Sequence, residues 1–326
     1  MRRLVIVLFV ALLAVGGWAA WTLRSPVQPA SPTFVLLRPG YSTRRIALEL
    51  KSAGVIRSAL VFRLWHYMHA SRSLKAGEYS FEHAADIAQI HDRLARGDIY
   101  FHTVTIPEGY TMFDVARAIE EAGLGTAQNF LEVARTETGL ISGLAPEAKS
   151  LEGYLFPETY QFTRTQSMKD MAAAMVKQFR QVAGQIGLSS DVQRTVTMAS
   201  IVEKETAVPE ERPLVAGVYY NRLRQKMALD ADPSVIYALL LAGNYQGALH
   251  HDDMFVKSPY NTYRNPGLPP GPIANPGRGS LEAAMHPQAS QFFYFVSDSA
   301  GHHRFATSME DHNRNVRAYR RAMRGQ

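Results

Sequence analysis

The stretch FVLLRPGYSTRRIALELKSAGV, Phe34 to Val55, decides how the first half of the chain folds, because it recurs. TVTIPEGYTMFDVARAIEEAGL, Thr103 to Leu124, matches it almost position for position. Each copy has a β-rich run, a Pro-Gly or Pro-x-Gly turn, and a Tyr followed by Ser or Thr. Apolar residues at helical spacing then lead to a closing Ala-Gly. Each copy is therefore predicted to form a strand, a turn and a helix.

The residues between the copies continue this alternation. A helix is expected over Ser58–Ala70, and LKAGEYSFEHAADIAQIHDRLARGD, Leu74 to Asp98, predicts a further short strand and helix. Such a repeat resembles the LysM-like modules that grip glycan chains, so residues 33–125 are expected to form a LysM-like region. Two related packing units without a ligand are the alternative.

The N-terminus carries a long apolar segment. Leu4–Leu23 has no charged residue, follows Arg2 and Arg3, and is long enough to cross a membrane as a helix. We expect a cytoplasmic tip over 1–3, a transmembrane helix over 4–23 and a Pro- and Ser-rich linker over 24–32. The alternative is a cleaved signal peptide, with small residues near the far end. Both interpretations place the rest of the chain outside the cytoplasm.

Composition excludes some classes of site. The 326 residues contain no cysteine, so disulfides and thiolate metal sites are excluded. The formal net charge of +6 suits anionic surfaces or polymers, but it is not gathered into long basic blocks, so nucleic acid is not an expected partner.

After Leu151 the sequence changes character. Helices are predicted near Lys169–Ile186, Ser190–Thr206 and Glu210–Leu223, with Ser189 or Ser190 as the cap of the second. A loop rich in Pro, Gly and Asn, Ser258–Gly279, precedes a strand at Phe292–Asp298 and a hairpin-like segment. The predicted fold class is α+β, with a mainly helical domain with a small β element over 150–326 and a boundary within 125–150.

MASIVEKETA, Met198 to Ala207, contains two carboxylates, Glu203 and Glu205. In a helix, Glu205 stands below apolar residues three, four and seven positions earlier, whereas the surroundings of Glu203 are smaller and more mixed. A carboxyl group in apolar surroundings keeps its proton near neutral pH, as a general acid for a glycosidic oxygen must. The alternative is that Glu205 ends the helix and pairs with Lys204, Arg212 or Arg222.

Other polar groups suit a sugar ligand. Tyrosines and amides on a Pro-stiffened loop offer stacking faces and hydrogen bonds to hydroxyl groups. The candidates for substrate binding are Glu152, Asp232, Tyr260, Asn261 and Tyr263. Each also has a structural interpretation, such as Asp232 as a helix cap.

Seven separated motifs resemble one family. ASIVEKET, EGYLFPETY, DPSVIYAL, YNTY, GLPPGPIANPG, HPQASQFFYFVSD and HRFATSMEDHN are similar to those of the YceG-like (MltG) endolytic murein transglycosylases. The resemblance covers essentially the whole chain. One departure is EGYLFPETY, where the family has Asp as often as Glu, so that a carboxylate is retained either way.

The resemblance implies cleavage of the MurNAc–GlcNAc β-1,4 bond within glycan strands, which leaves 1,6-anhydro-MurNAc ends and terminates nascent strands. It places the single catalytic acid at Glu205 and implies no cofactor and no metal. It implies a single-pass protein of the inner membrane, with a cytoplasmic N-terminus and a periplasmic catalytic domain near cell-wall synthases (penicillin-binding proteins). A hydrolytic muramidase and a membrane-anchored glycan-binding scaffold are the alternatives.

Overall fold

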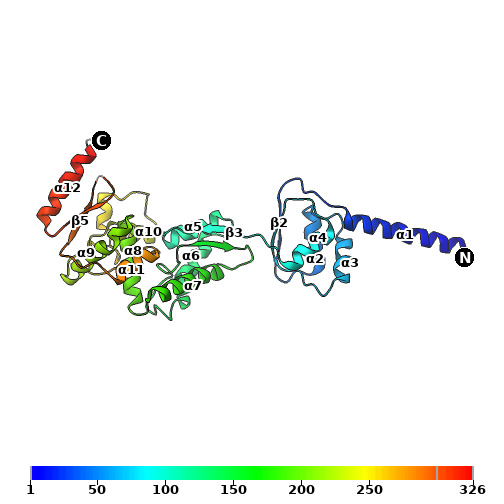
Figure 1. Cartoon of the computed structure of the whole chain (residues 1–326), viewed down its shortest axis with the longest axis horizontal. Helices are drawn as coiled ribbons and strands as arrows, with labels where there is room; N and C mark the ends of the chain where they lie inside the picture. The colour runs from blue at the N-terminus through cyan, green and yellow to red at the C-terminus, as the bar shows by residue number, and fades with distance from the viewer. Residues whose placement is uncertain (1, 299, 325–326) are drawn as a thin grey trace. The chain divides into compact units, whose positions relative to one another are not determined.

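A computed structural model describes residues 2–298 and 300–324. The chain divides into two compact units, Met1–Thr103 with Gln161–Ser167, and Val104–Tyr160 with Met168–Gln326. The predicted mixed α+β class is confirmed: the chain is mostly helical, with three sheets of two strands among the described residues (Figure 1). It stays a prediction that residues 33–125 form a LysM-like region and that residues 150–326 form a catalytic domain.

The N-terminal unit packs helices on a small sheet. Its elements are α1 (Arg2–Arg24), β1 (Thr33–Leu37), α2 (Thr43–Ser52), α3 (Ala59–Met68), β2 (Gly77–Phe81) and α4 (Ile87–Arg96). β1 and β2 pair antiparallel, from Thr33 opposite Phe81 to Leu37 opposite Gly77. Alternate strand residues such as Leu37 and Tyr79 are fully buried in one core with α2, α3 and α4.

The two repeats fold as predicted up to the end of each helix. The first gives β1 and α2, and the second gives β3 (His102–Thr105) and α5 (Met112–Glu121). Ser42 and Thr111 cap the two helices by accepting a backbone N–H three residues later. Because the units divide after Thr103, the turn and helix of the second repeat belong to the C-terminal unit.

α1 is one long apolar helix. Its side chains from Leu4 to Trp21 are largely exposed, whereas Ala19 and Leu23 near its end contact the core of the N-terminal unit. Its length and composition are compatible with a single-pass membrane anchor.

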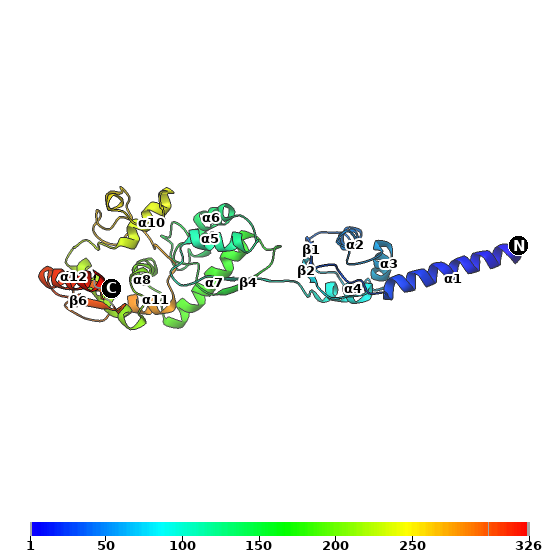
Figure 2. The same cartoon turned by 90° about the horizontal axis from the view of Figure 1, so that it is seen from above.

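The C-terminal unit is built mainly from helices. After α5 come α6 (Ala127–Thr136), η1 (Thr138–Leu140), β4 (Thr159–Phe162), α7 (Met168–Ile186), α8 (Val192–Glu205), η2 (Pro209–Glu211), α9 (Arg212–Arg224), α10 (Asp232–Ala242), η3 (His251–Phe255), α11 (Arg278–Met285), β5 (Tyr294–Ser297), β6 (His303–Ala306) and α12 (Met309–Arg324). β3 pairs with β4, and β5 pairs antiparallel with β6. α9, α10 and α11 pack around α8, which is a central element of this unit. Figure 2 shows α8 between α10 and α11.

The start of α8 differs from the prediction. Its cap residue is Asp191 rather than Ser189 or Ser190, and Asp191 lies in the left-handed region, with φ of 49°. Its side chain accepts no capping hydrogen bond. The expected side-chain cap is absent, and the backbone instead turns sharply into the helix at Asp191.

Candidate active site

α8 ends on Glu205, the acid that the helical spacing selected. Met198, Ile201 and Val202, on the preceding turns, are fully buried. Side chains three, four and seven residues apart share one face of a helix, so Glu205 continues an apolar face. Its own side chain is only partly exposed.

A tyrosine from the next helix meets this carboxyl group. Tyr219 of α9 donates a hydrogen bond from its hydroxyl to Glu205 Oε1 at 2.8 Å. Burial, with a smaller contribution from the charge of Asp232, raises the pKa of Glu205 to about 7, although the Tyr219 hydrogen bond and the charge of Arg222 oppose the rise. A substantial fraction of Glu205 is therefore protonated near neutral pH.

Glu203 is also buried, with 5% of its side chain exposed, but its partners are different. Arg212 lies 3.2 Å from Glu203 Oε1, and the backbone N–H of Gly277 donates to Oε2 at 2.9 Å. Glu203 is thus held as a charge-paired carboxylate. Burial alone does not distinguish the two acids; the difference is that Glu205 lacks a cationic partner within ion-pair distance among the residues that the structure describes.

The three bases considered as partners of Glu205 bind other groups. Lys204 donates to the carbonyl of Gly109 at 3.3 Å, and Arg212 contacts Glu203. Arg222 donates to the carbonyls of Phe293 at 2.6 Å and Leu229 at 2.9 Å, and to Asp230 at 3.2 Å. Arg222 therefore fixes the surrounding loops and acts on Glu205 through its charge.

Two of the predicted substrate-binding residues form a pair near Glu205. Tyr263 donates to Asp232 Oδ1 at 2.6 Å, and both side chains are exposed. Burial of the hydroxyl and the neighbouring Asp232 raise the pKa of Tyr263, and the charge of Glu205 adds to this effect. The three groups therefore share one electrostatic environment. Asp232 begins α10 but makes no side-chain cap.

Asn261 lies inside the loop that carries Tyr263. It is fully buried, and its amide donates to the carbonyls of Met254 and Val256, each at 3.0 Å. Its Oδ1 accepts the backbone N–H of Tyr263 at 3.0 Å. Asn261 shapes the loop, while its neighbour Tyr260 is partly exposed.

Glu152 is 1% exposed and sits below the site's surface. Both of its carboxyl oxygens accept from the backbone N–H of Met112 at 3.0 Å, at the start of α5. Burial raises the pKa of Glu152 to about 8, although the hydrogen bonds from Met112 and Tyr237 oppose the rise. With so little exposed surface, this carboxyl group binds the start of α5 from inside the unit rather than facing the surface.

Asn275 connects three of the sequence motifs and was not among the predicted residues. Its Oδ1 accepts from the backbone of Gly153 at 2.8 Å and Leu155 at 2.9 Å. Its Nδ2 donates to the Tyr110 carbonyl at 2.9 Å and to Glu152 Oε1 at 3.1 Å. The loop containing Asn275 is thereby joined to the EGYLFPETY motif and to the turn of the second repeat.

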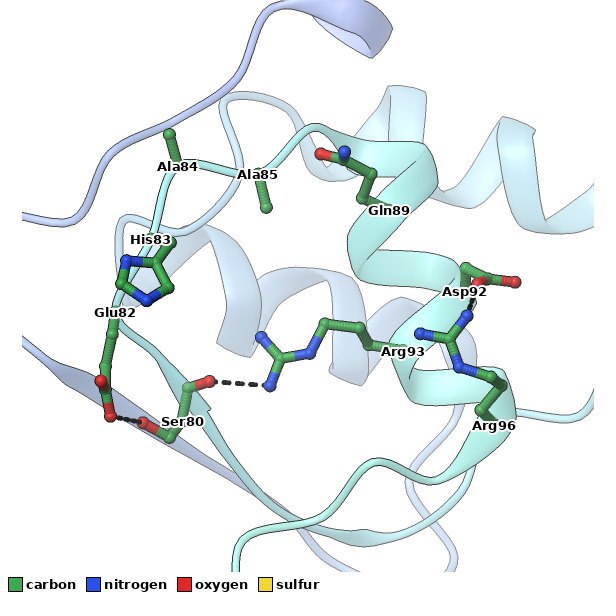
Figure 3. Close-up of a pocket in the computed structure, with 9 residues that line it drawn as sticks. All are labelled: Ser80, Glu82, His83, Ala84, Ala85, Gln89, Asp92, Arg93 and Arg96. Atoms are coloured by element: carbon green, nitrogen blue, oxygen red, sulfur yellow. Dashed lines mark hydrogen bonds and ion pairs between the residues drawn. The ribbon is translucent and has the colours of Figure 1, made fainter.

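The N-terminal unit contains a separate open hollow of about 650 Å³, lined by the end of β2, the segment after it and one face of α4 (Figure 3). Arg93 reaches toward the carbonyl of Ser80, to which it donates at 3.0 Å. The lining of this hollow includes no Tyr, Trp or Phe and none of the predicted site residues. The buried acid at the end of α8 is the stronger candidate for catalysis.

A model of the YceG-like family matches residues 35–318. The chain belongs to the YceG-like family. The resemblance inferred from the seven motifs is thereby confirmed. This YceG-like chain is 33% identical, over 332 residues, to the endolytic murein transglycosylase of Bacillus subtilis (strain 168), covering 94% of this chain and 91% of that protein.

Two further similarities extend the comparison. An endolytic murein transglycosylase of Streptococcus pneumoniae serotype 2 (strain D39) is 32% identical over 94% of this YceG-like chain, which spans 63% of that longer protein. The crystal structure of a YceG-like protein from Listeria monocytogenes is 33% identical, with a TM-score of 0.57. The match covers 87% of this chain and 99% of that one.

Proposed function

We propose that this YceG-like protein is an endolytic peptidoglycan lytic transglycosylase that cleaves MurNAc–GlcNAc β-1,4 bonds within glycan strands and leaves 1,6-anhydro-MurNAc ends. The names of the related B. subtilis and S. pneumoniae proteins support the activity. The observation that carries the proposal is Glu205, a partly buried acid with a pKa raised to about 7 by burial.

In the proposed reaction Glu205 first acts as an acid. It gives its proton to the glycosidic oxygen as the bond from C1 to that oxygen breaks, and Tyr219 stabilises the carboxylate that forms. That carboxylate then accepts the proton of the C6 hydroxyl of the same sugar, whose oxygen bonds to C1. The nucleophile belongs to the substrate, so the reaction needs no water and no second enzymic carboxylate.

The exposed residues near the acid are proposed to contact the glycan. Tyr263 is 38% exposed and, with Tyr260, offers a ring for stacking and a hydroxyl for hydrogen bonding. Asp232 is proposed to orient Tyr263 and to maintain the pKa of Glu205. Asn261 and Glu152 support these residues from inside the protein.

We propose that α1 anchors the protein in the inner membrane with the N-terminus in the cytoplasm and both units in the periplasm. A basic pair before the apolar run supports this orientation. There the enzyme would terminate nascent strands near penicillin-binding proteins. Residues 33–125 are proposed to form the LysM-like region.

The test is digestion of purified sacculi by the full chain in detergent, with the new ends identified by mass spectrometry. The parent protein should release anhydro ends, and Glu205→Gln should lose about 10²–10⁴-fold of the rate, because general acid–base catalysis typically contributes that much. Glu210→Gln, an exposed acid in η2, is the matched control and should retain the parent rate. Reducing ends would indicate a muramidase. Binding without cleavage by the parent would indicate a scaffold.

A further inference from the structure

The last turn of a helix is its least constrained part, because its final carbonyls lack intrahelical partners. α8 nevertheless carries its reactive acid at its last residue, Glu205, followed by a cap bond from the Thr206 N–H to the Val202 carbonyl at 3.3 Å. Catalysis needs reacting groups held in place within fractions of an ångström. Contacts from outside α8 must therefore fix this turn.

Two side-chain pairs connect this turn to α9. Arg212, the first residue of α9, contacts Glu203 at 3.2 Å, and Tyr219 donates to Glu205 at 2.8 Å. Arg212 and Tyr219 are seven residues apart, two turns along one face of a helix. One face of α9 therefore contacts both Glu205, the proposed catalytic acid, and Glu203, the neighbouring structural acid.

The Arg212 pair is closely built into its surroundings. The side chains of Arg212 and Glu203 are 13% and 5% exposed, and Arg212 also contacts Glu108 at 3.3 Å. A Cβ on Gly277 would lie 1.8 Å from Glu108 Oε1, and one on Gly279 would lie 2.6 Å from Arg212 Nη1. The absence of side chains at both glycines permits this arrangement.

Glu108 belongs to the turn of the second repeat, which also touches α8 directly. Lys204 donates to the carbonyl of Gly109 at 3.3 Å, and a Cβ built on Gly109 would lie 3.6 Å from carbons of both Glu203 and Lys204. Asn275 holds the turn from the other side through backbone bonds to Gly109 and Tyr110. The turn therefore packs over the end of the catalytic helix.

We infer that Arg212 is a positioning residue, which fixes the last turn of α8 against α9 so that Glu205 meets the Tyr219 hydroxyl, and that Glu108 of the second repeat supports it. This inference rests on the proposed role of Glu205. It gives the second repeat a function in catalysis that does not require it to bind sugar.

The groups that face Glu205 determine what a variant should change. They are Tyr219 and Arg222 from α9, Asp232 from α10 and Tyr263 from the following loop. Arg212 is not among them, so its loss should affect Glu205 by moving the Tyr219 hydroxyl rather than by removing a nearby charge.

The experiment compares Arg212→Met, Arg212→Lys, Tyr219→Phe and the Arg212→Met/Tyr219→Phe double variant in the full chain. Arg212→Met should lower kcat about 10- to 100-fold with KM within about twofold, because misplacement by about 1 Å costs about 100-fold. Arg212→Met should also shift the alkaline limb of the pH–rate profile, where the rate falls as Glu205 loses its proton, to higher pH, as Tyr219→Phe should. The double variant should show no further movement, since both changes remove one interaction. Arg212→Lys, which keeps the positive charge, should have a kcat between those of Arg212→Met and the parent.

Arg194→Met, at an exposed arginine in the first turn of α8, is the matched control and should leave kcat and the limb unchanged. If Arg212→Met fails to fold, Glu108→Gln provides a milder change, because that side chain is 48% exposed. A ¹³C NMR titration of the Glu205 carboxyl group gives the same comparison without turnover, so failure of the proposed activity remains distinguishable. A fall in thermal stability alone, with kcat and the Glu205 titration unmoved, would overturn the inference.

Discussion

Replacing Tyr219 by Phe removes one hydroxyl group and with it the hydrogen bond to Glu205. That bond favours the ionised carboxyl group, so its loss should raise the pKa of Glu205 from its present value of about 7. A hydrogen bond to a charged group contributes about 1.5–3 kcal/mol, and one to a neutral group about 1 kcal/mol. The difference of about 0.5–2 kcal/mol corresponds to about one pKa unit, at 1.36 kcal/mol per unit.

The consequence is an alkaline limb displaced to higher pH. With a pKa of about 7, the parent should retain about one-tenth of its pH 6 rate at pH 8. A variant shifted by about one unit should retain about half. The plateau rate should fall modestly, because a weaker acid transfers its proton less readily.

The assay is the initial rate of anhydro-end formation from pH 5 to pH 9 for the parent and Tyr219→Phe. Circular dichroism at each pH confirms that both proteins stay folded. Tyr220→Phe is the matched control, because the neighbouring hydroxyl donates to the carbonyl of Ala284 instead. A limb that stays in place, or moves to lower pH, in Tyr219→Phe would refute the assigned role of this hydrogen bond.

Two other carboxyl groups give further predictions. Asp232→Asn removes a charge that raises the pKa of Glu205, so the alkaline limb of the rate profile should move to lower pH. Abolition of turnover at every pH would instead indicate a second catalytic carboxylate. Glu152 has a pKa raised to about 8 in the fold, so between about pH 4.5 and 8 the unfolded chain loses a proton that the folded chain keeps. The free energy of unfolding should therefore fall across that range, by about 5 kcal/mol from this group, and Glu152→Gln should flatten the decline in urea titrations. An unchanged slope in Glu152→Gln would contradict the assignment.

Local patterns along the chain predicted much of the architecture. The two copies of the strand–turn–helix repeat, the helices that became α7, α8 and α9, and the strand at β5 follow from apolar periodicity and turn residues. The choice of Glu205 over Glu203 followed from helical spacing, although the structure separates them by their partners rather than by burial.

Contacts between distant segments were beyond such reasoning. Tyr219 reaches Glu205 because α9 packs on α8, and spacing within one helix carries no information about its neighbour. Asn275 binds backbone groups more than 100 residues away in sequence, so its place in a Pro-rich loop suggested only stiffness. The burial of Glu152 had a local signal, because apolar and aromatic residues such as Leu151 and Tyr154 stand beside it in the sequence.

A titration of the Glu205 carboxyl carbon by ¹³C NMR, in the full chain with Glu205→Gln to assign the signal, tests the central claim most directly. A midpoint near pH 7, well above the ordinary pKa of 4.5 because of burial, is the predicted result. A midpoint at or below pH 5, in a protein that still cleaves glycan strands at neutral pH, would contradict the account.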